Sequence, residues 1–255
     1  MYMGNAKTMV IFEHPLNEKI RIWLRLEFLI KQLMYNKNFD ANNALYFFHL
    51  LNEILEIIER NDIRADLIKS IEEQKQKLSI WLNVPGVDTP LLDDLLSKLN
   101  VLIQQLSLDP KMGYDLKDDR FITAIRKRLT IPGGCCSFDL PFFHLWLQHP
   151  QSFRENQINQ WLDSFSTLFQ AMSLCMQLIR QSSHFKTLLC TNRFYQNSQD
   201  DISLLRIKVP FDKRLYPQVS GNNNRFAIRF LPLEPTLDND EQEESAEFEF
   251  ELACC

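Results

Sequence analysis

The sequence has no long hydrophobic run. Charged residues interrupt every apolar stretch before it reaches the roughly 18 residues that a membrane-spanning helix needs. The first nine residues contain one lysine and no apolar core, so we expect no secretory signal. Glycine is scarce, with 6 in 255 residues, and no GxGxxG or GxxxxGKS phosphate loop occurs. We therefore expect a cytoplasmic protein without direct membrane insertion and without a cofactor.

Signatures of enzymes and metal sites are missing as well. There is no HExxH or GxSxG motif, and Ser137, Asp139 and His144 lack the strand–turn–helix context of a catalytic nucleophile. None of the 6 cysteines has CxxC spacing. The adjacent pairs Cys135–Cys136 and Cys254–Cys255 suit zinc poorly, because its ligands are usually two to four residues apart. We expect no catalysis, no bound metal and reduced thiols.

Basic residues are absent from the end of the chain. After Leu231 come nine of the 33 acidic residues and no Lys or Arg, whereas residues 1–231 hold all 28 basic residues and the other 24 acidic ones. The larger part is therefore mildly basic, which favours an acidic partner but is too small an excess to imply DNA binding. The acidic run at 238–244 is predicted to be a flexible hairpin loop.

Helical periodicity is abundant in the first seven-tenths of the chain, where apolar residues recur at three- and four-residue steps. Asp40 is the predicted cap of the second helix, and Val84-Pro85-Gly86 has the sequence of a type II turn. Short loops between the first four helices favour an up-and-down antiparallel bundle. The predicted helices are 18–35, 40–60, 63–82, 89–106, 118–129 and 155–181.

Alternation of apolar and polar residues replaces this pattern after Ser183. Helices first and strands last indicate an α+β fold, with a helical bundle domain and an antiparallel β-sheet domain. We place the helical domain at 17–130 and 151–182, and the interleaved sheet domain at 9–16, 131–150 and 183–255. The predicted strands are 186–195, 202–209, 225–231 and 247–253, with brief ones at 9–12 and 136–140, the last before a helical turn around His144.

The strand at 225–231 offers a candidate binding surface. Phe226, Ile228 and Phe230 point to one face, and Arg225 and Arg229 point to the other. If this strand neighbours the one that carries Arg206 and Lys208, one sheet face is apolar and the other holds up to four cations. An alternative stays open at this point. The arginines can instead pair across the sheet with Glu247, Glu249 and Glu251 of the last strand, which would be an ordinary structural feature.

Several ordered blocks of the sequence resemble the ZapD family, whose members associate with the division ring of the bacterial protein FtsZ. Together they extend from about Ile11 to the last cysteine; the first nine residues resemble an added extension and receive no role. The blocks are FEHPLNEK (12–19), WLRLEFL (23–29), VPGVD (84–88), IPGGCCSFDLP (131–141), LYPQ (215–218), RFAIRF (225–230) and FELACC (250–255).

The resemblance implies a non-enzymatic dimer, located at the mid-cell division site, that binds the C-terminal tail of FtsZ and bundles its protofilaments. The family's basic surface maps onto Arg25, Arg120 in DDRFI, and Arg225 and Arg229 in RFAIRF. His144 matches a family histidine that follows the Asp-Leu-Pro block. One departure is the neutral segment 222–224, where relatives can carry a basic residue, so cation density there is expected to be lower.

Two other classes of function are alternatives to FtsZ binding. A nucleic-acid-binding module would use the same basic sheet face, but it needs exposed aromatic side chains, and Phe226 and Phe230 are predicted to lie in the core. A hydrolase built around Cys135 or Ser137 is the other. Neither class accounts for a resemblance that spans nearly the whole chain, and FtsZ binding is the leading prediction.

Overall fold

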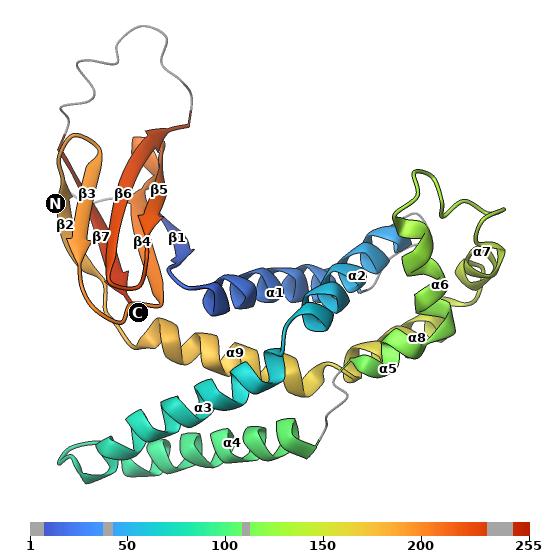
Figure 1. Ribbon diagram of the computed structural model, residues 1–255, viewed down its shortest axis with the longest axis horizontal. Coiled ribbons are helices and arrows are strands. Elements are labelled where there is room, and N and C mark those ends of the chain that lie inside the picture. The colour runs from blue at the N-terminus through green and yellow to red at the C-terminus, as the bar shows by residue number, and fades with distance from the viewer. Residues whose placement is uncertain (1–7, 38–42, 109–112, 234–246) are drawn as a thin grey trace, which may run out of the picture. The chain divides into compact units, whose positions relative to one another are not determined.

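The computed structural model describes residues 8–37, 43–108, 113–233 and 247–255 (Figure 1). Contacts divide the chain into two compact units. The β unit comprises residues 1–24 and 176–255, and the helical unit comprises residues 25–175. The predicted α+β class, with a helical domain and an antiparallel β-sheet domain, is confirmed. The domain limits drawn from the sequence stay a prediction.

Two antiparallel sheets form the β unit. The four-stranded sheet has the order β1 (Met9–Pro15), β4 (Leu204–Pro210), β7 (Phe248–Cys254), β2 (Lys186–Cys190). The three-stranded sheet has the order β3 (Phe194–Ser198), β6 (Arg225–Pro232), β5 (Leu215–Gly221). A short 3₁₀ turn, η2 (Phe211–Lys213), joins β4 to β5.

Apolar residues of both sheets share one core. Phe226, Ile228 and Phe230 of β6 are buried, as predicted, and they belong to the same cluster as buried residues of β4 and β7. The ring of Phe230 lies 5.0 Å from those of both Phe248 and Phe250, measured between centroids. Burying each such side chain stabilises the fold by about 1.5–3 kcal/mol. The two sheets therefore pack face to face as a sandwich.

This topology corrects one expectation. β4 and β6 are not neighbours, because they belong to different sheets. Since their apolar sides meet in the shared core, Arg206 and Lys208 lie on one outer face of the sandwich and Arg225 and Arg229 on the other. The prediction of four cations on one face is wrong.

Two strand predictions also need correction. The segment 186–195 is not one strand: Asn192 and Arg193 have positive φ angles of 54° and 52° and turn the chain from β2 into β3, in the other sheet. β5 was not predicted, since Pro217 stands in its middle. Proline lacks the N–H that a central strand needs, but β5 is an edge strand, where proline is tolerated.

In the helical unit, α3 and α4 form a hairpin (Figure 1). The turn between them runs through Gly86, whose φ of 88° is the value that a type II turn requires, as predicted. α2 packs against α6, so the contacts depart from a sequential bundle of the first four helices. The elements of this unit are α2 (Ala44–Arg60), α3 (Ile63–Ser79), η1 (Ile80–Asn83), α4 (Thr89–Leu108), α5 (Tyr114–Asp118), α6 (Arg120–Leu129), α7 (Pro141–Leu147) and α8 (Gln151–Asp163).

An ion pair joins α2 to α6. Arg126 Nη1 lies 2.7 Å from Glu59 Oε1, and Arg126 Nε donates a hydrogen bond of 2.8 Å to Asn52 Oδ1. Hydrogen bonding by this guanidinium is the main reason that the pKa of Glu59 is lowered. A group of aromatic side chains packs beside this contact, and Phe48 contacts the rings of Phe121 and Trp161.

Each of the two boundaries between the units falls within a helix. One helix is α1 (Glu18–Tyr35), which has the predicted bounds, and the other is α9 (Ser166–Gln181). The single long helix predicted at 155–181 is wrong, because α8 ends at Asp163. The hydroxyl of Ser164 donates a 2.7 Å hydrogen bond to the carbonyl oxygen of Trp161 and so competes with the helical bonding pattern.

The strand predicted at 136–140 is wrong too: turns fill this segment before α7 begins at Pro141. Its backbone bonds are local, from Cys136 N to Gly133 O and from Asp139 N to Cys136 O, so they need no strand partner. Three predictions lie wholly or largely outside the described residues, namely the Asp40 cap, the acidic hairpin at 238–244 and the extension at 1–9, of which residues 1–7 are not described.

Candidate functional site

Arg225 and Arg229 are exposed on the outer face of the three-stranded sheet. Four residues of extended chain separate them, so their Cα atoms are about 13 Å apart. In the register of the sheet, Arg229 pairs with Phe194 of β3 and Gln218 of β5, and Arg225 pairs with Ser198 of β3. None of these neighbours is acidic. Within 8–37, 43–108, 113–233 and 247–255, neither guanidinium has an ion pair, so both are available to a carboxylate ligand.

The cations of β4 are neutralised inside the protein. Glu13 of β1 accepts two hydrogen bonds from Arg180, of 2.8 and 2.7 Å, and one of 3.2 Å from Arg206. Lys208 Nζ lies 2.6 Å from Glu251 Oε2 of β7. The pairing with the last strand that the sequence left open is therefore found for Lys208 alone, with Glu251, whereas Arg206 pairs with Glu13 of β1; among the described residues no such pair involves β6.

Arg120 and His144 lie in the helical unit, on elements that pack together. Asp119 caps α6 by accepting hydrogen bonds from the amides of Phe121 and Ile122, at 2.8 and 3.0 Å. The ring of Phe121 lies 5.3 Å from that of Phe142 and 5.4 Å from that of Trp146, between centroids, which joins the start of α6 to α7. Arg120 and His144 are both exposed next to this aromatic contact.

Arg25 is exposed on α1, and the opposite side of the helix buries Trp23 and Leu26. The nearby Arg21 has a partner, since its Nη1 lies 3.4 Å from Glu18 Oε2. In the part of the chain that the structure describes, no hydrogen bond, ion pair or ring contact joins Arg25 to Arg120 or His144. The structure thus places Arg120 and His144 on adjoining helices, and Arg225 and Arg229 on one strand.

Sequence reasoning missed three side chains on the face of Arg225 and Arg229. Phe194 is 45% exposed and Tyr216 is 40% exposed, and Gln218 is exposed beside Arg229. Tyr216 and Gln218 lie on β5, which the sequence pattern does not predict, and Phe194 lies in a segment for which the pattern predicts one continuous strand. The alternation of Tyr216, Gln218 and Ser220 was the available signal.

Four of the thiols lie in surroundings that oppose a nucleophilic role. Burial raises the pKa values of Cys135, Cys254 and Cys255, and it raises that of Cys190 to about 11. A raised pKa keeps a thiol protonated at neutral pH, which opposes thiolate chemistry.

Among the described residues no group of three or more His, Cys, Asp or Glu side chains is arranged to hold a metal ion. Nor does any helix in those ranges combine the length and apolarity needed to cross a membrane.

Comparison with known proteins gives a consistent result. The family model of ZapD, described as a cell division protein, matches residues 24–229. Over 250 residues the chain is 45% identical to the cell division protein ZapD of Shigella flexneri, covering 98% of this chain and all of that protein. The ZapD protein of Escherichia coli O1:K1 gives the same identity and coverage. The chain therefore belongs to the ZapD family of cell division proteins.

Proposed function

We propose that this protein binds the C-terminal tail of FtsZ through exposed arginines and, as a dimer, bundles FtsZ protofilaments at mid-cell. The observation that supports this most is the exposure of Arg225 and Arg229 without an acidic partner among the described residues. Membership of a cell division family supplies the biological setting. Arg25, Arg120 and His144 are the further residues that we assign to tail binding.

The chemistry suits a flexible acidic peptide. A guanidinium binds a carboxylate through charge-assisted hydrogen bonds, each of which contributes about 1.5–3 kcal/mol. Ordering a flexible tail costs part of this energy, so a single contact is expected to be of moderate affinity. Exposed charges are also screened by salt. Tail binding should therefore weaken steeply as the salt concentration rises.

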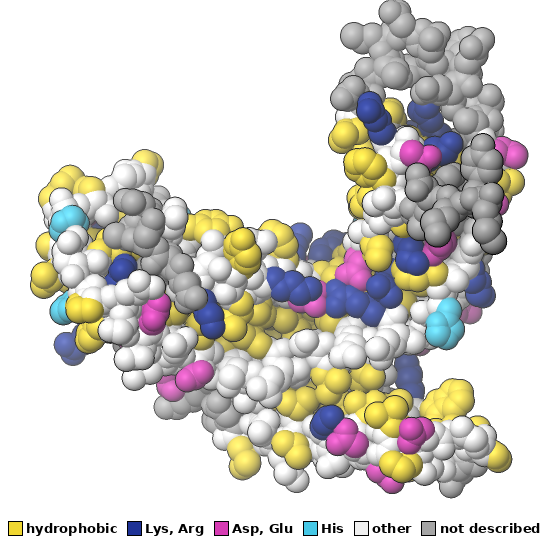
Figure 2. All heavy atoms as spheres, turned by 180° about the vertical axis from the view of Figure 1, so that it is seen from behind, with side chains coloured by type: hydrophobic (Ala, Val, Ile, Leu, Met, Phe, Trp, Pro, Cys, Tyr) yellow, Lys and Arg dark blue, Asp and Glu magenta, His cyan; other side chains and the backbone are white. Residues whose placement is uncertain are grey.

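Apolar side chains on the α3–α4 hairpin support dimer formation. Ile80, Trp81 and Leu91 are 70%, 54% and 66% exposed, and Figure 2 shows hydrophobic side chains along this hairpin. Exposed apolar groups of this size favour burial against a partner, and a second copy of the chain presents the same groups. A dimer carries two tail sites, and a filament carries many tails, so avidity strengthens a moderate contact. No catalytic step is needed.

The proposal is tested by reversing both charges, Arg225→Glu with Arg229→Glu. We expect this variant to lose co-sedimentation with FtsZ filaments at low salt and to keep its helical circular dichroism, because both side chains are exposed. The matched control is Lys186→Glu with Lys213→Glu, which makes the same change of charge at exposed positions of the same unit. Unchanged co-sedimentation of the arginine variant would remove this site.

The second candidate is single-stranded nucleic-acid binding, which gains one observation in its favour. Phe194 and Tyr216 expose rings on the face that carries Arg225 and Arg229, and aromatic groups beside cations are what base stacking requires. Fluorescence anisotropy with a labelled oligonucleotide and with an FtsZ tail peptide separates the two functions. We expect saturable binding of the peptide and none of the oligonucleotide at physiological salt.

A further inference from the structure

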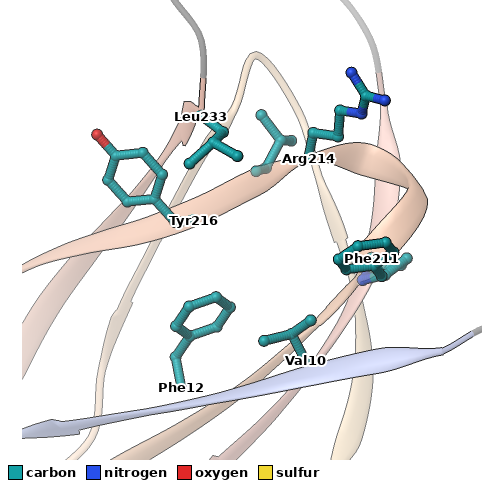
Figure 3. A pocket seen from close by; sticks show the side chains of 8 residues that line it. Val10, Phe12, Phe211, Arg214, Tyr216 and Leu233 are labelled. Carbon is teal, nitrogen blue, oxygen red and sulfur yellow. The ribbon is translucent and has the colours of Figure 1, made fainter.

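A groove of about 510 Å³ opens at one edge of the β unit, between the two sheets (Figure 3). Val10 and Phe12 of β1 line one side, and Tyr216 of β5 and Leu233, which follows β6, line the other. Phe211 of η2 also lines it. The walls are almost entirely apolar, although Phe211 and Leu233 are 67% and 71% exposed. Exposed apolar groups gathered in a groove mark a place where a ligand can bury them.

The strand beside this groove has a free edge. Within the ranges that the structure describes, β1 pairs with β4 alone, and β5 with β6 alone, so each is the edge strand of its sheet there. Proteins usually protect an edge with lysine, proline or a bulge. β5 carries Pro217 in its middle, whereas β1 has a charge at Glu13 and a proline only at its last residue, Pro15, so that residues 9–12 include neither. The backbone of β1 can therefore accept an added strand.

Side-chain direction connects this edge to the groove. Val10 and Phe12 alternate with Ile11, which is 49% exposed on the other side of β1. A strand added alongside β1 would alternate in the same way. Every second side chain of that strand would point into the groove, toward Tyr216 and Leu233. Such a ligand is an extended peptide with apolar residues at alternate positions.

Of the described residues that line the groove, Arg214 is the charged one. Arg214 has a φ of 51°, and its turn is fixed by hydrogen bonds from Arg214 N to Phe211 O at 3.1 Å and from Leu233 N to Arg214 O at 3.0 Å. Its side chain is exposed and, in the described part of the chain, has no ion pair. A guanidinium at an apolar groove favours a ligand that also carries a carboxylate.

The groove adjoins the face of Arg229. Tyr216 pairs with Leu231 in the register of β5 and β6, two positions from the pair of Gln218 with Arg229. Diagonal neighbours of this kind lie about 7–8 Å apart across a sheet. Tyr216 lines the groove and also lies on the face of Arg229. A peptide that crosses β5 can contact both places.

We propose that the groove binds the apolar side chains of an extended, carboxylate-bearing peptide, which adds as a strand to the free edge of β1. This inference rests on the proposed function: the peptide is the same tail segment whose carboxylates Arg225 and Arg229 bind. The arginine face supplies the salt-sensitive part of the affinity, and the groove supplies a part that salt does not screen.

The test measures binding of a labelled FtsZ tail peptide to the full chain by fluorescence anisotropy at 50 and 300 mM salt. For Phe211→Ala with Leu233→Ser we expect affinity to fall about 5- to 20-fold at both salt concentrations, since exposed apolar contacts are lost. Arg225→Glu with Arg229→Glu should instead flatten the salt dependence. Leu189→Ser, at a 54% exposed position of β2 away from the groove, is the control and should bind as the parent does.

A second measurement reports on the added strand directly. Hydrogen exchange of the amides of residues 8–14 should slow when the peptide is present, and Ile11→Lys, which protects the edge with a charge, should abolish this slowing. If the parent binds the peptide but the groove variant binds equally well, or if these amides exchange at the same rate, the groove inference is overturned and the proposed function stands. If Ile11→Lys changes the oligomeric state and leaves peptide affinity unchanged, the occupant is a second copy, and the inference falls. If the parent binds no peptide, the proposed function fails first.

Discussion

β4 and β6 carry the same kind of sequence and have opposite surroundings. Each alternates buried apolar residues with two outward cations, Arg206 and Lys208 in β4, and Arg225 and Arg229 in β6. In the four-stranded sheet, Glu13 and Glu251 from the adjacent strands bind the cations of β4. In the three-stranded sheet, the positions opposite Arg229 are Phe194 and Gln218. The neighbouring strands therefore decide whether a cation is structural or available for a ligand.

The ring of Phe185 is a further difference between the surroundings of the β4 cations and those of the β6 cations. The Arg206 guanidinium lies 5.0 Å from the centre of this ring, and Lys208 Nζ lies 3.9 Å from it, distances at which a cation is attracted to an aromatic face. The cations of β4 are thus partly removed from solvent as well as neutralised. The face of β6 keeps its guanidinium groups exposed, which maintains their attraction for an external carboxylate.

The largest effect is expected for Glu13→Ala. It leaves Arg180 and Arg206 half-buried without their shared carboxylate, so we expect the free energy of unfolding to fall by about 2–3 kcal/mol. Chemical denaturation followed by circular dichroism measures this change. Glu18→Ala, which removes an exposed pair with Arg21, is the control and should cost no more than about 0.5 kcal/mol. Equal costs for the two variants would show that Glu13 has no special structural role.

The comparison can be broken by giving β6 the surroundings of β4. Gln218→Glu places a carboxylate beside Arg229, on the adjacent strand. We expect affinity for the FtsZ tail to fall about tenfold, or ~1.4 kcal/mol, because the guanidinium then has an internal partner. Peptide titration at low salt measures the loss. Gln218→Met, which removes the amide without adding charge, should keep most of the affinity, and equal losses in both variants would contradict the electrostatic explanation.

A smaller effect is expected for the pair Lys208 and Glu251, which lie opposite each other on β4 and β7. Their side chains are partly exposed, so we expect a coupling energy of about 0.2–1 kcal/mol. A double-mutant cycle with Lys208→Met and Glu251→Gln, followed by urea denaturation, measures it. The coupling should decrease as salt is added. A coupling energy of zero would leave the packing on Phe185 as the main role of Lys208.

The smallest effect concerns pH. Burial, and secondarily the charge of Arg21, lower the pKa of His14 from its ordinary value of 6.5. The unfolded chain then takes up a proton before the folded protein does, so stability should decline as the pH falls below about 6.5 and level off below the folded pKa. Denaturation midpoints measured between pH 8 and 5 test this. His14→Gln should flatten the decline in this range, and an unchanged profile would assign it to other groups.

Periodicity was sufficient to predict much of the fold. The bounds of α1 and the buried face of β6 follow from local spacing, because each buries one continuous set of apolar residues. The missed features depend on other parts of the chain. Pro217 interrupts the strand pattern of β5, which is an edge strand. Between β2 and β3, a two-residue turn with positive φ angles leads the chain from one sheet to the other. Near Ser164, whose hydroxyl bonds to the carbonyl oxygen of Trp161, α8 ends although periodicity would continue the helix.

The candidate site was only partly open to prediction. Arg225 and Arg229 were found from alternation and from the family motif, but the absence of an acidic neighbour among the described residues could not be predicted, because it depends on which strands flank β6. Phe194, Tyr216 and Gln218 join this face through strand pairing. The groove beside β1 brings together residues that are distant in the sequence, such as Val10 and Arg214, which are about 200 positions apart.

By itself the sequence determined the α+β class, the inward and outward faces of each correctly predicted strand, and membership of the ZapD family. These properties depend on local periodicity and on ordered motifs, which are independent of how strands pair. Tertiary structure alone decided that Arg206 and Lys208 are neutralised, that Arg225 and Arg229 have no acidic partner among the described residues, and that a groove opens beside β1. Electrostatic pairing and apolar burial act over a few ångströms, so their outcome depends on which distant segments the fold brings into contact.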